Sequence, residues 1–387
     1  MFVFVCAGCG AGLTTALSQV ALPVHAHQKY GNGTQLPVLM ESGTFAVDPE
    51  PGGPPWRSGE EIDPDEAAAR GISAPVHALS DAVRGAVVIA PGDARGTALI
   101  PEKAGGSCCG LDWGDGPNMA CEACGLPVAS RIDDCSLWQA VWLAPDAVRR
   151  CPVDDEPAAP LSWAEATAAG KGTPPFEPLA SWGSRLGAGH WSNHRWYWSP
   201  RWEAAAGRAL AHLLAASEGR PVTVPDGLVA EMFHRALDAL LPAATAVAAP
   251  ARRAVLAGPG LPGPGPDADA DADAEILIVP THPQTGETWT PSGPVGPAAS
   301  AYLVPLPFGV WLWLAFPEPY PPVPASGGLP EGVLRDDFDP PAPHSPHLFR
   351  ADPEVFRNTL VRLPAARSPW LREILENLPQ HRRSGLF

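Results

Sequence analysis

The chain has 387 residues, including 49 Pro and 39 Gly, and 42 acidic against 26 basic residues give it a formal charge of −16. A chain so rich in proline is not built mainly from long helices. Its acidity disfavours nucleic acid, and its apolar runs fall short of the ~18 residues of a membrane span. The first 150 residues carry 17 acids and 9 bases and the remainder carries 25 and 17, so no basic module is hidden within the chain.

The first 160 residues are predicted to form an α+β domain of short strands and capped short helices. Asp63 followed by Pro64 is typical of a helix start, with aspartate as the N-cap and proline in the first turn. The glycine at position 71 marks the end of this helix. Short apolar runs predict strands at residues 2–5, 36–47, 86–90 and 137–143.

Residues 161–242 are predicted to contain a Trp-rich segment and a helical hairpin. Ser199 and Pro200 are typical of an N-cap and first helical residue, and apolar residues follow at helical spacing until Gly219. A second helix is expected before Pro242, because apolar residues again recur on one face. This region and residues 276–387 are expected to pack as one domain.

Residues 243–275 are predicted to be a disordered linker, because Gly-Pro repeats and alternating Asp-Ala offer nothing to bury. Beyond the linker, the apolar stretch 302–316 is broken by Pro305, Pro307 and Gly309, which favours buried strands over a helix. Two short helices that begin near Pro353 and Pro369 are expected to close the chain.

The strongest motif is a pair of CxxCG sequences, in which Cys6 and Cys9 precede one glycine and Cys121 and Cys124 precede another. Two thiolates separated by two residues can hold one metal ion from a tight turn, and two such pairs complete a tetrahedral site. The following glycine allows the positive φ that brings backbone amides toward the sulfurs. These four cysteines are therefore the predicted metal ligands, with zinc as a structural cofactor.

The other cysteines leave alternatives open. Cys108 or Cys109 can replace Cys6 and Cys9 as partners of Cys121 and Cys124, since the spacing from Cys109 is short. A further alternative is a second zinc site, for which the candidates are Cys108, Cys109, Cys135 and Cys151. Because CxxC pairs in a chain without a convincing secretion signal indicate metal ligands rather than disulfides, we expect a cytoplasmic protein.

The two CxxCG pairs, the first preceded by a Phe-Val-Phe-Val strand, resemble the knuckles of a zinc ribbon. That resemblance covers only residues 2–13 and 117–128, and 111 residues separate Cys9 from Cys121, far more than in most ribbons. The preference for Arg over Lys and the abundance of Ala, Pro and Gly resemble proteins of high-GC actinobacteria. This second resemblance implies no activity.

The sequence favours a soluble, zinc-stabilised binding or adaptor protein over an enzyme. It contains no GxSxG, HExxH or Walker A motif, and a closed four-cysteine site leaves no position for a reactive water. The protein or small-molecule partner is not indicated. A nucleic-acid-binding zinc ribbon is a further alternative, which the acidity of the chain disfavours.

A second site hypothesis rests on aromatic residues between positions 182 and 202. An exposed cluster of tryptophans and histidines can stack on a sugar or a cationic ligand. The same residues can instead fill the core, where tryptophan is commonly found. The alternative function is therefore a small-molecule or carbohydrate-acting enzyme or binder, whose ligand would contact His190, Trp191, His194, Trp196 and Trp198.

Overall fold

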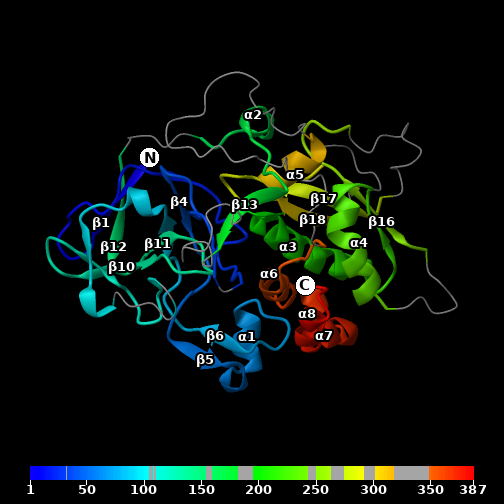
Figure 1. Ribbon diagram of the computed structural model, residues 1–387, viewed down its shortest axis with the longest axis horizontal. Helices are drawn as coiled ribbons and strands as arrows, with labels where there is room; N and C mark the ends of the chain where they lie inside the picture. The colour runs from blue at the N-terminus through cyan, green and yellow to red at the C-terminus, as the bar shows by residue number, and fades with distance from the viewer. Residues whose placement is uncertain are drawn as a thin grey trace. The chain divides into compact units, whose positions relative to one another are not determined.

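The chain divides into two compact units, each described here by itself (Figure 1). The first unit contains Met1–Ser162, His282–Glu287 and Arg357–Glu376, and the second contains Trp163–Thr281, Thr288–Phe356 and Asn377–Phe387. Two short segments expected in the C-terminal domain thus belong to the first unit. The computed structural model describes residues 1–31, 33–103, 108, 110–153, 159–181, 195–242, 250–262, 274–291, 301–317 and 348–387.

A seven-stranded sheet forms the centre of the first unit. Neighbouring strands are antiparallel except for the first pair, β2 and β4, which is parallel. In spatial order the strands are β2 (Ser18–Gln19), β4 (Thr44–Val47), β7 (Val87–Ile89), β11 (Ala140–Leu143), β10 (Pro127–Ile132), β9 (Met119–Cys121) and β8 (Thr97–Leu99).

Successive residues of the central strands point to opposite sides of this sheet. Residues on each side belong to a buried core, so both faces are covered. On β11, Val141 joins a core that also contains Cys6 and Cys121, whereas Trp142 joins a second core. On β7, Ile89 lies in the first core and Val88 in the second. The two cysteines and the Trp142 ring therefore lie on opposite faces of one sheet.

Smaller elements surround this sheet. Strand β1 (Phe2–Cys6) pairs antiparallel with β12 (Val148–Pro152), and β5 (Trp56–Ser58) pairs with β6 (Ala78–Ser80). Helix α1 (Pro64–Ala69) begins as predicted, since the Asp63 side chain accepts from the amides of residues 65 and 66. The remaining short elements that precede residue 104 are β3 (Thr34–Gln35) and the 3-10 turns η1 (Gly59–Glu61), η2 (Pro91–Asp93) and η3 (Pro101–Lys103).

The second unit contains a four-stranded parallel sheet with helices beside it (Figure 1). Helix α3 (Pro200–Ser217), capped by the Ser199 hydroxyl, packs against β18, and α4 packs against α3. The sheet consists of β15 (Val222–Thr223), β16 (Arg252–Leu256), β17 (Ile276–Thr281) and β18 (Tyr302–Pro307). Between residues 163 and 315, the structure also describes α2 (Trp163–Ala169), the antiparallel pair β13 (Phe176–Ser181) and β14 (Arg195–Trp198), α4 (Leu228–Leu240) and α5 (Phe308–Ala315).

The chain closes with short helices, as the prolines at 353 and 369 predict. These helices are α6 (Pro353–Leu360), the 3-10 turn η6 (Pro364–Arg367), α7 (Pro369–Glu376) and α8 (Leu378–Arg383). The predicted α+β class, with short strands and capped short helices, is confirmed.

Two predictions for the C-terminal half are corrected by the structure. The stretch 302–316 was expected to form strands throughout, but Phe308–Ala315 form helix α5. This helix is apolar on nearly all sides, and periodicity cannot distinguish such a buried helix from a strand. Within the predicted linker, Arg252–Leu256 form strand β16, in which Ala254 pairs with Ile276. Residues 243–249 and 263–273 of that linker lie outside the described residues.

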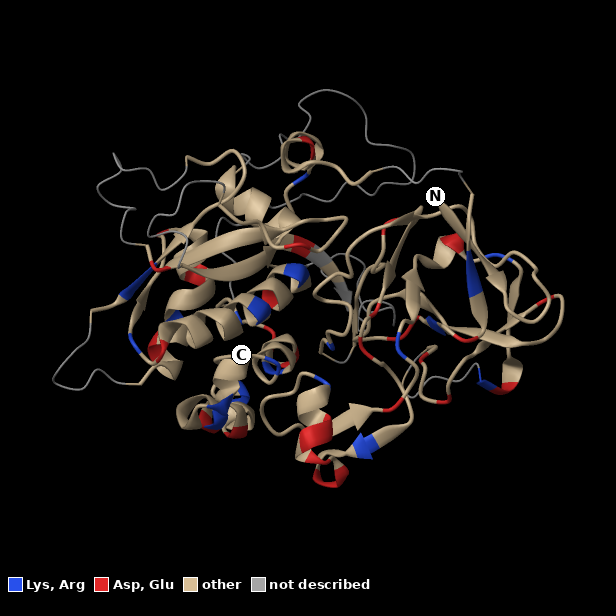
Figure 2. Cartoon of the chain, turned by 180° about the vertical axis from the view of Figure 1, so that it is seen from behind, with Lys and Arg blue, Asp and Glu red and all other residues tan. Residues whose placement is uncertain are grey.

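Acidic and basic residues are interspersed along the elements of both units (Figure 2). Many are paired: Arg57, for example, contacts both Glu66 and Asp81, which hold its charge in a local network. Of the helices that the structure describes, none combines the length and apolar character needed to cross a membrane. The even charge distribution agrees with the counts along the sequence.

Candidate functional site

The first CxxCG pair occupies the turn of a β-hairpin. Its first arm is β1, which bonds back to residues 11–17 through several backbone hydrogen bonds. Within the turn, the Cys6 amide donates to the Ala11 carbonyl at 2.8 Å and the Gly10 amide donates to the Cys6 carbonyl at 2.9 Å. Gly10 has φ +78°, as the motif predicts.

The second CxxCG pair repeats this turn between β9 and β10. The Cys121 amide donates to the Leu126 carbonyl at 2.9 Å, and the Gly125 amide donates to the Cys121 carbonyl at 2.8 Å. Gly125 has φ +77°. The two motifs therefore adopt the same backbone conformation, which is set locally by the cysteine spacing and the terminal glycine.

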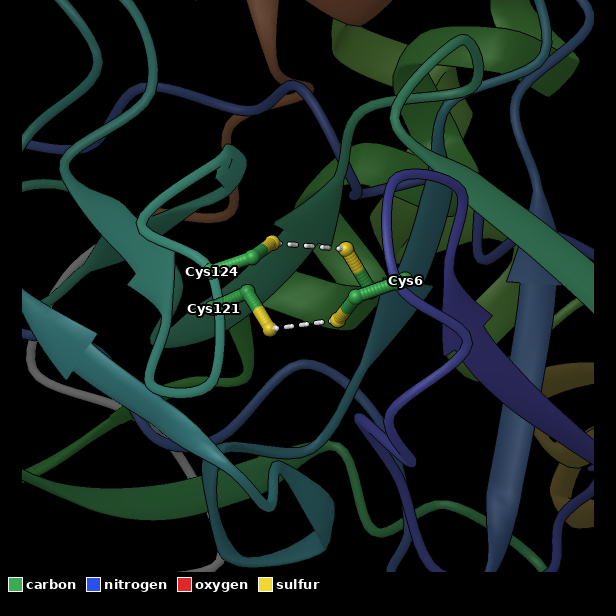
Figure 3. Close-up of side chains that lie close together, drawn as sticks. Cys6, Cys121 and Cys124 are labelled. Carbon is green, nitrogen blue, oxygen red and sulfur yellow. Dashed lines mark hydrogen bonds between the residues drawn. The ribbon is translucent and has the colours of Figure 1, made fainter.

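All four predicted cysteines meet at one point (Figure 3). The sulfurs of Cys6 and Cys124 are 3.6 Å apart, those of Cys9 and Cys121 are 3.7 Å apart, and all four lie within 4.8 Å of one another. A disulfide needs about 2.05 Å. A tetrahedral ion with metal–sulfur bonds of about 2.3 Å places its sulfurs about 3.8 Å apart. The spacing therefore matches four ligands of one metal ion.

Burial differs between the members of each pair. Cys6 and Cys121 are at most 1 % exposed and belong to the sheet core, whereas Cys9 and Cys124 are exposed. Gly8 lies above the cluster: a Cβ atom there would be 3.6 Å from the Cys124 sulfur and 3.7 Å from the Cys6 sulfur. The centre is thus held by the core on one side and open to solvent on the other.

The pKa values of Cys6 and Cys124 are shifted in opposite directions. Burial raises the pKa of Cys6, but hydrogen bonds from the backbone at Cys9 and Gly8 and from neighbouring thiols outweigh it and lower the pKa to about 7. For Cys124, a backbone hydrogen bond from Leu126 lowers the pKa, but the neighbouring thiols and burial raise it to about 12. The Cys6 thiol therefore loses its proton more readily than an ordinary cysteine, and the thiolate is the form that binds metals.

The competing ligand set is not assembled among the described residues. Cys108 lies apart from this cluster, with its sulfur 3.5 Å from that of Cys135, and Cys109 lies outside the described part of the chain. Cys151 is on β12 and belongs to neither of the metal-ligand groups that the described residues form. The structure thus brings together Cys6, Cys9, Cys121 and Cys124, which can hold a metal ion.

The predicted aromatic ligand site is only partly described. Trp198 is 3 % exposed and packs between Phe176 and Phe349, with ring centroids 4.3 and 4.8 Å away, which is the environment of a core residue. Trp202, the tryptophan of α3, is fully buried as well. The other predicted members lie outside the description, entirely for His190, Trp191 and His194 and in the side chain for Trp196.

A pocket in the first unit was missed by sequence reasoning. It has a volume of about 320 Å³, and its lining includes Trp142, which points to the face of the sheet opposite the cysteines. His27 lines it, with Nε2 2.7 Å from a carboxylate oxygen of Asp48, which is 2 % exposed. The His27 ring stacks on Trp142, and Trp113 lies 5.5 Å from Trp142 between ring centroids.

The sequence did contain one signal for this pocket. His25 and His27 alternate along the chain, which suggested an extended segment, but residues 24–27 form a turn, in which the Ala26 amide donates to the Pro23 carbonyl; His27 faces the pocket from this turn. Its partners Asp48, Trp113 and Trp142 come from separate loops and a strand, so no local spacing connects them. Such a His–Asp pair beside aromatic rings can bind a ligand that offers hydrogen-bonding groups and an apolar face.

No protein-family model matches this chain, and neither the curated proteins nor the solved structures contain one with significant similarity to it. Functional inference therefore rests on the geometry of these sites.

Proposed function

We propose that this protein is a soluble cytoplasmic binding or adaptor protein whose first unit is stabilised by a structural zinc ion. The observation that carries the proposal is the convergence of four cysteine sulfurs, from two matching turns, at the spacing of a tetrahedral site. Cysteine thiolates favour zinc over hard cations such as Mg²⁺ or Ca²⁺. Four protein ligands fill the coordination sphere, so the ion has no position at which to activate water.

A structural role is also supported by where the ligands lie. Cys6 ends the strand that pairs with β12, and Cys121 ends an inner strand of the seven-stranded sheet. A metal at this point connects two parts of the first unit that are more than 100 residues apart along the chain. Because the unfolded chain does not hold a preformed site, metal binding contributes directly to folding.

Metal analysis tests this proposal. The purified protein is expected to contain zinc, and Cys6→Ser and Cys121→Ser are each expected to lose the zinc of this centre and to lower the thermal stability of the first unit. The control is Cys151→Ser, which alters a thiol of the same unit outside the centre. Protein without stoichiometric metal, or full zinc retention in both variants, would contradict the proposal.

The pocket at His27 favours a second candidate function, the binding of a small hydroxylated ligand such as a sugar. Its lining combines the Trp113 and Trp142 rings with the carboxylates of Asp48 and Asp81. An aromatic ring packs against the apolar face of a sugar, and carboxylates accept hydrogen bonds from its hydroxyls. The volume of about 320 Å³ lies at the lower end of the range for small-ligand pockets.

A fluorescence titration with a panel of mono- and disaccharides tests this second candidate. Binding is expected to change tryptophan emission in the wild type and to be lost in Trp113→Ala. Trp56→Ala is the matched control, because Trp56 is 60 % exposed and does not line the pocket. A panel without any saturable response, or an equal response in Trp113→Ala, would exclude this function for the pocket. The predicted site at His190–Trp198 is tested by the same titration with His190→Ala.

A further inference from the structure

A second group of metal-binding side chains lies apart from the Cys6 centre. The sulfurs of Cys108 and Cys135 are 3.5 Å apart, and a carboxylate oxygen of Asp134 completes a group whose donor atoms all lie within 4.8 Å of one another. Cys135 is 3 % exposed and Asp134 is 7 % exposed, whereas Cys108 is exposed. An ionised carboxylate buried to this extent needs a compensating positive charge or hydrogen bonds.

The backbone brings Cys108 to this position by a close approach of two segments. Leu111 and Asp133 form an antiparallel bridge, in which each amide donates to the other's carbonyl at 3.2 and 2.9 Å. At Gly110, a Cβ atom would lie only 1.9 Å from the Asp133 carbonyl oxygen. Only glycine therefore allows the segment with Cys108 to lie against the segment with Asp134 and Cys135.

Buried hydrogen bonds fix both segments further. The Asn118 side chain, 1 % exposed, donates to the carbonyls of Asp112 and Arg131 at 2.8 and 2.9 Å and accepts from the Arg131 amide at 2.7 Å. These hydrogen bonds connect Asp112 to Arg131, which lies near the end of β10 and three residues before Asp134. Buried side-chain networks of this kind hold one backbone arrangement.

The turn that carries the other two donors is also constrained. The Asp134 carboxylate accepts from the Cys135 amide at 2.7 Å, which orients it beside the sulfur. Ser136 has φ +66°, a conformation that is uncommon for residues other than glycine. Its amide donates to the Thr34 carbonyl and its carbonyl accepts from the Tyr30 amide. Strain held by surrounding contacts is typical of functional positions.

We propose that Cys108, Asp134 and Cys135 form a second transition-metal site, which binds zinc or a similar divalent ion. Two thiolates and one carboxylate are three of the four ligands of a tetrahedral ion, and zinc accepts both sulfur and oxygen donors. The fourth position is filled by water or by one further donor, so this site differs in kind from the closed four-cysteine centre.

A metal explains this group better than a disulfide between the two cysteines. A disulfide would hold the two sulfurs about 2.05 Å apart, whereas they lie 3.5 Å apart, which is close to the spacing of two sulfur ligands on one tetrahedral ion. The inference does not depend on the Cys6 centre, because the two groups share no residue.

The experiment counts metal ions in protein that has been reduced, reconstituted with zinc and freed of excess zinc by gel filtration. The wild type is expected to hold two zinc ions per chain, and Cys108→Ser and Asp134→Asn are each expected to hold one. Cys108 is exposed, so its substitution leaves no cavity in the core. Cys151→Ser is the control and should hold two ions, while Cys6→Ser should lose only the ion of the other centre.

A variant that keeps all three proposed ligands tests whether the close approach of the two backbone segments is needed for metal binding. Gly110→Ala forces the segment of Cys108 away from Asp133, so it is expected to lose the second ion although all three donors remain. Reconstitution of metal-free Cys6→Ser with cobalt in place of zinc provides an independent measure, because thiolate-to-cobalt absorption should then appear through this site. A wild type whose one ion is retained in Cys108→Ser, two ions in both Cys108→Ser and Gly110→Ala, or a Cys108–Cys135 disulfide that excludes metal would overturn the proposal.

Discussion

Removal of the metal from the four-cysteine centre should destabilise the first unit strongly. The perturbation is either a chelator or the Cys121→Ser substitution, which removes a ligand that is 1 % exposed. In the folded unit, the two turns already meet, because Cys6 and Cys121 belong to the same buried core and the four sulfurs lie within 4.8 Å of one another. The metal therefore binds the folded state without any cost of bringing its ligands together.

The magnitude follows from the length of chain between the two turns. An unfolded chain that kept the metal on all four thiolates would have to close a loop between Cys9 and Cys121, which are 112 positions apart in the chain. The chain-entropy relation for cross-links gives about 5 kcal/mol for a loop of this length. Saturating metal should therefore stabilise the folded unit by at least about 5 kcal/mol, a large part of the stability of a typical domain.

Urea unfolding read by hydrogen exchange measures this effect within the first unit. With a denaturant slope of about 2 kcal/mol/M, a loss of about 5 kcal/mol lowers the midpoint by about 2.5 M. Exchange should accelerate in β1, β9 and β10, and Cys151→Ser should leave the midpoint unchanged. An unfolding curve that is the same with and without chelator would refute the reasoning, since it would mean that no metal joins the two turns.

Three further predictions concern local features. Gly125→Ala should lower metal affinity at a cost of about 1 kcal/mol, because Gly125 has φ +77°. Gly12→Ala is the control: an added Cβ meets no atoms within 4 Å at either glycine, so Gly12→Ala should keep the wild-type affinity. Zinc competition titrations compare the two variants. Burial, aided by the charge of Arg208, lowers the pKa of His212 from 6.5 to about 4, so the unfolded state binds the proton more readily below pH 6.5. The free energy of unfolding of the second unit should therefore fall by up to about 3 kcal/mol between pH 6.5 and 4. In urea melts, this fall should be smaller in His212→Gln. His234→Gln, at an exposed site, is the control and should behave as wild type. Gly207→Ala should cost about 2–3 kcal/mol in thermal melts, because its Cβ would lie 2.5 Å from the Asp352 carbonyl oxygen; an unchanged melting temperature would contradict this packing.

The candidate metal ligands were predictable because each turn is a local structure. The CxxCG spacing and the glycine at its end specify the hydrogen bonds of both turns, and helix starts at Pro64 and Pro200 followed from equally local capping signals. The helix at Phe308–Ala315 was not predictable in this way, because a short segment that is buried on nearly all sides has no polar face to reveal its period. Strand β16 was hidden because its two arginines and the prolines around it outweighed a three-residue apolar signal.

The sequence by itself indicated which residues are candidate metal ligands, since thiol spacing and turn conformation depend on neighbours in the chain. Tertiary structure alone decided which distant groups meet. It placed Cys6 and Cys9 against Cys121 and Cys124, joined Cys108 to Asp134 and Cys135 instead of to either CxxC pair, and set His27 beside Asp48. The physical reason is that strand order and the close approach of backbones fix these contacts, and neither is encoded in the spacing of the residues that come together.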